Sequence, residues 1–400
     1  MKENNFPGGG KKRWIVFFGE DWGEHPSTGQ FLALELQHKY NVLWVDSLGL
    51  REPEINLQDV FRILKKLKSS FFNKSKKNSL LTKRQSNIYP VTPLTLPYWR
   101  FSVVRWWNRL YLKRFFLKHY KTNGIIDPLV ITTCVASSQV VKDITKNCII
   151  YYCADEYSLM PGLNPILVDY LERKLLSSVD VVFAVSKALV NSKSRYHPVV
   201  KYLPHGVDIE LFERALSANI ARPKDLPNEY KKIIGFVGLL GEHIDYRVIE
   251  HLAQKMDDCA IVLIGNREHA VTIPNQKNVL YLGPKKRKAL PEYLAYFDVC
   301  INPYLENDRN RYANPTKLKE YMAAGKMVVM TPHSEIEEIP NQIEFATTPE
   351  EFEKKTRALL NIDKDSVKGA ISSRMKNHSW AERAEWMIRE IERCKQRQEK

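Results

Sequence analysis

The sequence predicts an α/β protein with two doubly wound parallel sheets, each carrying helices on both faces. Short apolar runs alternate with helical patterns along most of the 400-residue chain, which is typical of parallel sheets with crossover helices. The alternation falls into two series, separated by a loop-like segment at 206–231. The chain length also favours two or three domains.

The first series predicts a domain over 1–205, in which 1–12 is expected to be disordered and 50–120 forms a basic, aromatic insertion. Ligands in such sheets bind outside the carboxyl ends of the strands. The expected elements are strand RWIVFF, a helix near 31–39, strand NVLWVDS, the stretch NIYPVTP, a helix near 103–120, strand LVITT, a helix opened by Ser137, strand CIIYYCADE, a helix near 164–176, strand DVVFAVS, a helix from Ser186, and strand VVKYLPHG.

The second series predicts a domain over 206–378, followed by a C-terminal helix within 379–400 that contains the amphipathic run WAERAEWMIREIERC. The domain's expected elements are strand KIIGFVG, a helix near 246–255, strands AIVLIGN and VLYLGP, a helix near 288–296, strand VCINPY, a helix opening at Asn314, strand MVVM, and helical segments from Pro349.

The stretch NPTKLKEYMAAGKMVV predicts a short helix that could hold an anion at its start. Asn314 is a favourable N-cap, Pro315 suits the first helical position, and Gly325 suits the position after the helix end. A helix N-terminus attracts phosphate, and Lys317 in the first turn would add positive charge. Glu320 shares a face with Lys317 and could accept hydrogen bonds from a sugar diol. An ordinary capped surface helix with an ion pair fits the same residues.

This helix and the strands around it resemble the GT-B fold glycosyltransferases, specifically the family-four-like enzymes that use nucleotide-sugar donors. The resemblance is strong over 203–331 and concerns mainly the layout in the N-terminal half. The sequence is most similar to the branch that builds teichuronic-acid-type and other exopolysaccharides, which shares the aromatic strand ending in acids, here YYCADE. The stretches that carry the resemblance are LPHGVDIELF, GFVGLL, AIVLIGN, NVLYLGP, LPEYLAYFDVCINPY and NPTKLKEYMAAGKMVV.

The resemblance implies two Rossmann-like domains facing a central cleft, with the donor bound mainly by the C-terminal domain. It also implies that the last helix crosses back to the N-terminal domain. The site residues that it implies are Glu320 for the ribose, Asn314, Thr316 and Lys317 for the diphosphate, Tyr281 to Gly283 for the base, and Gly238 for an open turn beside the donor.

The chain departs from the family pattern at two places. Many members have Glu-x7-Glu ending at the position of Glu320, but the earlier position here is Tyr312. Many also carry Arg and Lys after the glycine-rich turn, where this chain reads GLLGEHIDYR. The candidates to replace these cations are His243, Arg247, Arg309 and Arg311.

Glycosyl transfer requires a stabilised leaving diphosphate, and Lys317 with the helix dipole is our candidate for that task. An inverting mechanism also needs a base for the acceptor hydroxyl. Asp155 and Glu156 follow a predicted strand, and we favour Asp155 as the base. In a retaining mechanism Asp155 would orient the acceptor, and a purely structural cap is the remaining alternative.

The loop GEDWGEHPSTGQ follows the first predicted strand and supplies His25, Thr28 and Gln30 as candidate acceptor contacts. A solvated loop in which Ser27 or Thr28 caps the next helix is equally compatible with the sequence. No Asp-x-Asp motif or His/Cys cluster indicates a metal. We therefore expect no metal and no cofactor besides the nucleotide-sugar co-substrate.

The net charge of +15 predicts an acidic partner. The six scattered cysteines favour free thiols in a reducing compartment. The chain contains no apolar run long enough for a membrane span and no signal-peptide core. These features indicate a cytoplasmic protein.

Residues 98–120, YWRFSVVRWWNRLYLKRFFLKHY, interleave aromatics and cations and contain no acid. This pattern suits an anionic membrane surface, with Arg105, Arg109, Lys113 and Arg114 as the expected anchoring cations. A core helix with outward-pointing cations is an alternative. Nucleic acid is a weaker candidate, because the rest of the chain predicts a small donor cleft.

The combined expectation is a membrane-associated glycosyltransferase at the inner face of the membrane. It would transfer a sugar, with UDP-sugar as the expected donor, to a lipid-linked or polysaccharide acceptor in cell-surface polysaccharide synthesis. The alternatives are a non-hydrolysing nucleotide-sugar epimerase and a non-catalytic partner of the same fold.

Overall fold

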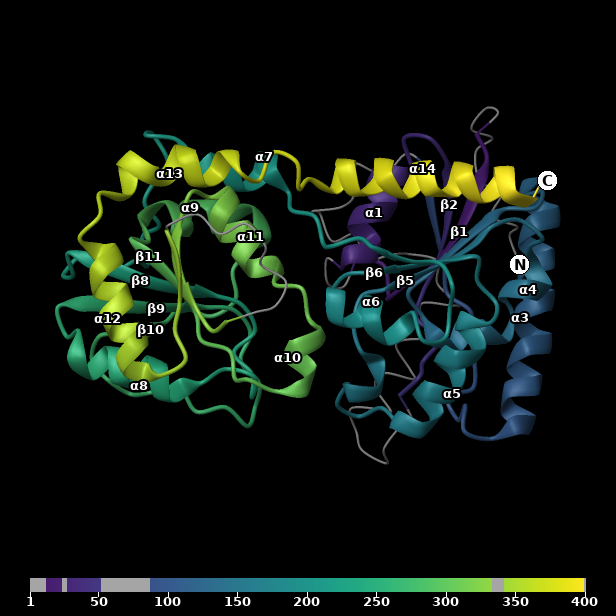
Figure 1. Cartoon of the computed structure of the whole chain (residues 1–400), viewed down its shortest axis with the longest axis horizontal. Coiled ribbons are helices and arrows are strands. Elements are labelled where there is room, and N and C mark those ends of the chain that lie inside the picture. The colour runs from purple at the N-terminus through teal and green to yellow at the C-terminus, as the bar shows by residue number, and fades with distance from the viewer. Residues whose placement is uncertain (1–11, 24–26, 52–86, 333–341, 399–400) are drawn as a thin grey trace. The chain divides into compact units, whose positions relative to one another are not determined.

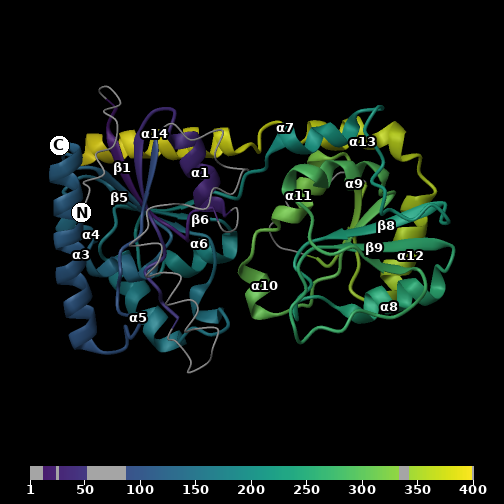
Figure 2. The same cartoon turned by 180° about the vertical axis from the view of Figure 1, so that it is seen from behind.

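The chain folds into two compact units, each with its own sheet (Figures 1 and 2). This computed structural model describes residues 12–23, 27–51, 87–332 and 342–398. The first unit comprises Met1–Pro204 with Arg383–Lys400, and the second comprises His205–Glu382. The N-terminal stretch expected to be disordered lies outside the described residues, except for Lys12.

The first unit contains a seven-stranded sheet in the order β3-β2-β1-β4-β5-β6-β7, in which all neighbours are parallel. The parallel sheet predicted from the sequence is therefore confirmed. Most strand residues are buried, as expected where helices cover both faces. The strands are β1 (Trp14–Phe18), β2 (Asn41–Val45), β3 (Ile88–Val91), β4 (Leu129–Thr132), β5 (Ile149–Cys153), β6 (Val181–Ala184) and β7 (Val200–Tyr202).

Helices α1 and α14 lie on one side of this sheet, and α5 and α6 lie on the other (Figures 1 and 2). Asn164 and Ser186 cap α5 and α6 with their side chains. The helix expected from Ser137 is instead a 3-10 turn, Val135–Gln139, followed by the single turn α4. The helices are α1 (Thr28–Leu36), α3 (Ser102–Asn123), α4 (Val141–Ile144), α5 (Pro165–Leu176), α6 (Lys187–Lys193) and α14 (Trp380–Gln398).

The second unit contains a six-stranded parallel sheet in the order β10-β9-β8-β11-β12-β13. Helices α8 and α12 cover one face, and α9, α11 and α13 cover the other (Figures 1 and 2). The strands are β8 (Lys232–Val237), β9 (Cys259–Ile264), β10 (Val279–Tyr281), β11 (Val299–Asn302), β12 (Met327–Met330) and β13 (Ile343–Phe345).

The segment 206–231 was predicted to be a loop, and this prediction is wrong in part. It contains α7 (Ile209–Phe212) and a 3-10 turn, because Asp208 caps the N–H of Leu211 and Phe212 is fully buried. The other helices of the unit are α8 (Tyr246–Lys255), α9 (Leu290–Tyr296), α10 (Asp308–Tyr312), α11 (Thr316–Ala323), α12 (Pro349–Leu360) and α13 (Lys364–Ser373).

Both sheets reverse their strand order beside their first strand, between β1 and β4 and between β8 and β11. In doubly wound sheets, ligands bind at such switch points, outside the carboxyl ends of the strands. The loops that follow these strands are therefore the places to look for a site in each unit.

Candidate functional site

Three loops pack backbone against backbone at the carboxyl edge of the second sheet. The Gly238 N–H donates to the Ile264 carbonyl (2.9 Å), and the Gly265 N–H donates to the Gly283 carbonyl (3.1 Å). Gly265 has φ +148°, and a Cβ there would lie 1.7 Å from the Gly238 oxygen. A Cβ on Gly238 would lie 2.9 Å from the Phe236 ring. Glycine at these positions therefore keeps the edge compact and leaves the backbone close to any ligand.

Glu320, the expected ribose ligand, lies on α11 between two cations. Its Oε2 accepts from Lys317 Nζ (2.8 Å), and its Oε1 accepts from Arg287 Nη1 (2.6 Å). The Arg287 guanidinium also lies over the Phe212 ring, 4.9 Å from the centroid. Burial alone would raise the pKa of Glu320, but the charges of Lys317 and Arg287 outweigh this effect and lower the pKa to about 2. Glu320 is therefore an ionised acceptor beside two positive groups.

Arg287 was not identified as a site residue from the sequence. It lies in a 3-10 turn between β10 and α9, thirty-three residues before Glu320. The only signal was the basic run KKRK at 285–288. Such runs are usually solvated faces, so the run alone could not single out Arg287.

The start of α11 differs from the prediction. Pro315, not Asn314, is the N-cap, and no side-chain cap is formed. Asn314 is buried, and its Oδ1 accepts from Lys319 Nζ (2.9 Å), which also donates to the His205 carbonyl (2.6 Å). The amide is thus used to fix the loop before the helix. Thr316 is the first helical residue and is half-buried.

The end of α11 confirms the prediction for Gly325. Its φ is +68°, and its N–H donates to the Met322 carbonyl (2.8 Å). The next N–H, of Lys326, donates to the Tyr321 carbonyl (2.9 Å). This pair of bonds is a Schellman end, which stops the helix and turns the chain into β12.

The loop after β8 brings His243 to the same edge. Its ring lies 5.3 Å from that of Tyr304, in the loop after β11. Burial and then the charge of Arg309 lower the pKa of His243. Arg247 instead pairs with Asp245 at the exposed start of α8 (2.7 Å). His243 and Arg309 thus lie close to each other, whereas Arg247 is used at the helix cap.

Tyr281, expected near the base, ends β10 and is 38% exposed. Its hydroxyl donates to the Gly265 carbonyl (3.0 Å), and the Arg267 guanidinium lies 5.9 Å from its ring centroid. An exposed aromatic ring fixed at its hydroxyl end can stack a planar ligand. Tyr281 is therefore placed suitably for the role predicted for it.

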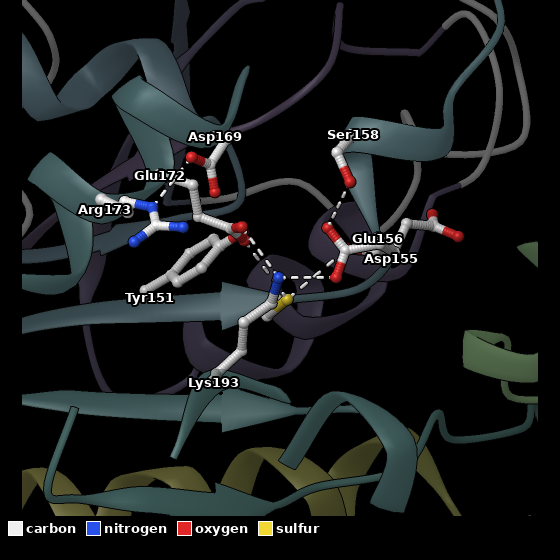
Figure 3. A network of polar contacts seen from close by, with 9 residues as sticks. Tyr151, Asp155, Glu156, Ser158, Asp169, Glu172, Arg173 and Lys193 are labelled. Atoms are coloured by element: carbon white, nitrogen blue, oxygen red, sulfur yellow. Dashed lines mark hydrogen bonds and ion pairs between the residues drawn. The ribbon is translucent and has the colours of Figure 1, made fainter. Parts of the chain in front are cut away.

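In the first unit, Asp155 follows the carboxyl end of β5 and is half-buried. Its side chain points away from the buried network formed by its neighbours (Figure 3). Glu156 belongs to that network, where its Oε2 accepts from Lys193 Nζ (2.7 Å) and its Oε1 from Ser158 (2.8 Å). Of the two acids considered from the sequence, Asp155 is therefore the one directed away from the core.

Further polar groups lie beside Asp155. Burial, followed by the charge of Asp155, raises the pKa of Tyr157, and Glu20 after β1 contributes to the same shift. The loops after β1 and β5 therefore place two acids near one phenol. Sequence reasoning missed Tyr157 and Glu20, because an isolated tyrosine or loop acid gives no distinctive signal.

Of the three residues predicted as acceptor contacts in the loop after β1, the structure describes Thr28 and Gln30. Ser27 is the N-cap of α1 and accepts from the Gln30 N–H (3.4 Å), while Thr28 is the first helical residue. Gln30 is fully buried, and its amide bonds to the backbone of Asp21 and Gly23. Gln30 thus shapes the loop from inside. His25 lies outside the described residues.

Helix α3 carries an exposed apolar face with cations beside it. Asn108, Leu112 and Phe116 are buried, whereas Val103, Trp106, Trp107 and Leu117 are each at least half exposed. Lys113, Arg114 and Lys118 are also exposed. Among the helices in the described ranges, none has the length and apolar character needed to cross a bilayer.

Two of the four expected anchoring cations have other roles. Arg109 makes a double hydrogen bond with Asp143 (2.6 and 2.9 Å). Arg105 donates to the carbonyls of Trp99 and Arg100 (both 2.8 Å). These arginines hold α3 to its own unit, which leaves Lys113 and Arg114 of the expected set on the exposed side.

One group in the described part of the chain could hold a metal ion: Cys148, Asp180 and Cys394, whose ligand atoms lie within 4.8 Å of one another. Cys148 and Asp180 directly precede β5 and β6, so the group lies at the amino ends of these strands. Asp155 follows the opposite end of β5. The group therefore lies at the opposite edge of the sheet from Asp155, apart from the candidate site of the first unit.

Comparison with known proteins agrees with this geometry. Residues 231–362, all within the second unit, match the family model described as Glycosyl transferases group 1. The chain has the GT-B fold, and the segment that matches the family model contains Arg287, Lys317 and Glu320.

Among curated proteins, the chain is similar to the "Putative teichuronic acid biosynthesis glycosyltransferase TuaH" of Bacillus subtilis (strain 168), with 27% identity over 206 residues. The match covers 46% of this chain and half the length of that relative.

Solved structures share the fold over nearly the whole chain. Anabaena Alr3699/HepE, in complex with UDP and glucose, is 12% identical with a TM-score of 0.63, and covers 94% of this chain and 99% of its own. A glycosyltransferase from Rickettsia africae ESF-5 is 13% identical with a TM-score of 0.66, and covers 96% and 99%. A UDP-forming trehalose-phosphate synthase from Burkholderia xenovorans is 12% identical with a TM-score of 0.62, and covers 95% and 99%.

Proposed function

We propose that this protein is a glycosyltransferase that moves a sugar from a nucleoside diphosphate sugar, with UDP as the expected nucleotide, to an acceptor hydroxyl. The observation that carries the proposal is Glu320 held between Lys317 and Arg287 at the carboxyl edge of the second sheet. The family match to residues 231–362 and the UDP complexes of proteins with this fold support it.

The three side chains can serve a nucleotide diphosphate together. A carboxylate accepts about four hydrogen bonds, so Glu320 can hold both cations and still accept from the ribose hydroxyls. An ammonium has three donors, so Lys317 can bond to phosphate oxygens while it stays paired. Tyr281 would stack the base, and Asn314 and Thr316 would shape the turn beside the phosphates. Gly238 and His243 would line the same edge.

In the reaction, the bond between the sugar C1 and the diphosphate oxygen breaks, and the acceptor oxygen bonds to C1. Lys317, Arg287 and the start of α11 would stabilise the charge that develops on the leaving diphosphate. In an inverting reaction, Asp155 would take the proton of the acceptor hydroxyl. In a retaining reaction, Asp155 would orient the acceptor instead. This scheme requires no metal.

The acceptor side of the proposal is a lipid-linked glycan used for cell-surface polysaccharide, as the name of the Bacillus subtilis relative suggests. The exposed face of α3 supports a peripheral position on an anionic membrane, at its cytoplasmic side. Aromatic side chains favour the interface, and Lys113 and Arg114 would meet lipid phosphates.

The proposal is tested by thermal shift of the purified protein with UDP, GDP, ADP and dTDP and with their common sugars. We expect one nucleotide to raise the melting temperature, and Glu320→Ala to abolish the increase. Glu250→Ala, an exposed acid on α8 of the same unit, is the matched control and should behave as wild type. No shift with any nucleotide would favour a non-catalytic protein. Release of an epimerised sugar without an acceptor would favour an epimerase.

A further inference from the structure

Three charged side chains are buried together behind the loop that carries Asp155 (Figure 3). Lys193 on α6 is 3% exposed, Glu172 on α5 is 7% exposed, and Glu156 in the loop after β5 is 11% exposed. Lys193 Nζ bonds to Glu156 Oε2 (2.7 Å) and to Glu172 Oε2 (2.8 Å). One ammonium thus joins two helices to the loop.

The network extends into the strand itself. The Tyr151 hydroxyl donates to Glu172 Oε1 (2.7 Å), and Cys153 Sγ lies 3.9 Å from the same oxygen. Burial raises the pKa of Glu172, while Lys193 opposes that rise. Every charged member therefore has a partner, as buried charges require.

Stability alone does not account for this arrangement. Burying an ion pair costs desolvation energy that its attraction only partly offsets, and apolar replacements of the same volume are often as stable. A buried charged group is better explained where it holds a neighbouring segment in one conformation. Here that segment is the turn at 153–156.

The bonds of the network fix the residues on both sides of Asp155. Cys153 Sγ donates to the Asp155 carbonyl (3.5 Å), and Glu156 is bonded to Lys193 and Ser158. Asp155 itself points away from this cluster (Figure 3). The backbone of Asp155 is thus tied down while its carboxylate is directed elsewhere.

We propose that Lys193 is a positioning residue, which acts through Glu156 to hold the Asp155 carboxylate in place for the acceptor hydroxyl. This inference rests on the proposed glycosyl transfer. It assigns Lys193 no contact with donor or acceptor, so the nucleotide site of the second unit should not depend on it.

The test compares Lys193→Met, which keeps the length but removes the charge, with Lys193→Arg and with the control Lys187→Met. Lys187 lies on the same helix and is exposed. We expect Lys193→Met to lower kcat for transfer at least tenfold, while the UDP thermal shift and the donor KM stay as in wild type. Lys193→Arg should recover part of the rate, and Lys187→Met should match wild type.

A second variant, Glu156→Ala, keeps the Lys193–Glu172 pair and breaks the link between Lys193 and the loop, together with the hydrogen bond from Ser158. Its kcat for transfer should also fall at least tenfold. This variant therefore tests the inference even if Lys193→Met does not fold. Transfer at the wild-type rate in Glu156→Ala, measured well below its melting temperature, would overturn the inference.

Glu156→Gln separates positioning from direct catalysis by Glu156, because the amide oxygen can still accept from Lys193 but the side chain cannot take a proton. Transfer lost as fully in Glu156→Gln as in Glu156→Ala would indicate that Glu156 is the base, and that result would also overturn the inference. If wild type shows neither a nucleotide shift nor transfer, the proposed function fails instead, which is a distinguishable outcome.

Discussion

Arg287 and Glu320, from the turn before α9 and from α11, form an ion pair of 2.6 Å in which both side chains are largely buried. The pair joins the segment after β10 to the helix expected to bind the donor phosphates. Because Arg287 holds the acid that we propose binds the ribose, it would also lie close to a bound nucleotide.

We therefore predict that Arg287→Ala weakens UDP binding about tenfold, or about 1.4 kcal/mol, measured by calorimetric titration. The variant loses one positive charge and leaves Glu320 paired with Lys317 alone. Arg374→Ala, an exposed arginine of the same unit, should bind UDP as wild type does. Equal affinities for Arg287→Ala and wild type would remove Arg287 from the site.

Glu320 should make the stability of the protein sensitive to acid. Its pKa of about 2 in the folded chain lies below its ordinary value of 4.5. The stabilisation is therefore complete above pH 4.5 and is lost as the pH falls toward 2, with an upper size of about 3 kcal/mol. Denaturant unfolding from pH 6 to 3 should show the wild type losing its advantage over Glu320→Gln. A constant difference across this range would contradict the prediction.

Lys326 should also make the stability of the protein rise with pH, in this case at alkaline pH. Its Nζ donates to the carbonyls of Ala295 and Phe297, and burial lowers its pKa to about 8 from 10.5. The unfolded chain then binds more protons between pH 8 and 10.5, so this group makes stability rise with pH in that window. Relative to Lys326→Met, the free energy of unfolding of the wild type should increase by up to about 3 kcal/mol between pH 8 and pH 10.5. A difference that stays flat in urea titrations at pH 7.5, 9 and 10.5 would disprove the assignment.

Gly265→Ala should destabilise the second unit by about 2–4 kcal/mol, because the new Cβ would collide with the Gly238 carbonyl at a positive φ. Gly369→Ala is a control that should change the free energy of unfolding in the opposite direction. Gly369 lies inside α13 with open space at its Cβ position, so alanine there should stabilise the helix by about 0.5–1 kcal/mol. Chemical denaturation measures both, and a neutral Gly265→Ala would show that the loops can separate freely.

The exposed face of α3 should bind anionic vesicles. We expect wild type to sediment with vesicles that contain phosphatidylglycerol, and the double variants Trp106→Ala/Trp107→Ala and Lys113→Glu/Arg114→Glu to lose at least tenfold in partitioning. Tyr196→Ala removes an aromatic that is 46% exposed elsewhere in the first unit and should bind like wild type. Binding that survives both double variants would exclude this face as the anchor.

The elements that the sequence predicted correctly are those with strong local causes. The apolar runs became strands, and Asn164, Ser186 and Gly325 ended or began helices where expected, because capping depends on a few adjacent residues. The two parallel sheets followed from the strand–helix alternation.

The errors and omissions concern partners that are distant in sequence. Asn314 has the ideal residue type for an N-cap, but Lys319 and the loop geometry use its amide differently. Arg287 and Lys193 were missed because only the folded chain brings them to Glu320 and Glu156. No local pattern encodes such long-range pairs.

The return of α14 to the first unit has a consequence for the order of folding during synthesis. Met387 and Ile391 are fully buried there, and Trp386 packs on Phe183 of β6. These residues are translated after the entire second unit. The first unit therefore leaves the ribosome with an apolar face still uncovered, and until residues 383–398 emerge that face is a target for chaperones and for aggregation.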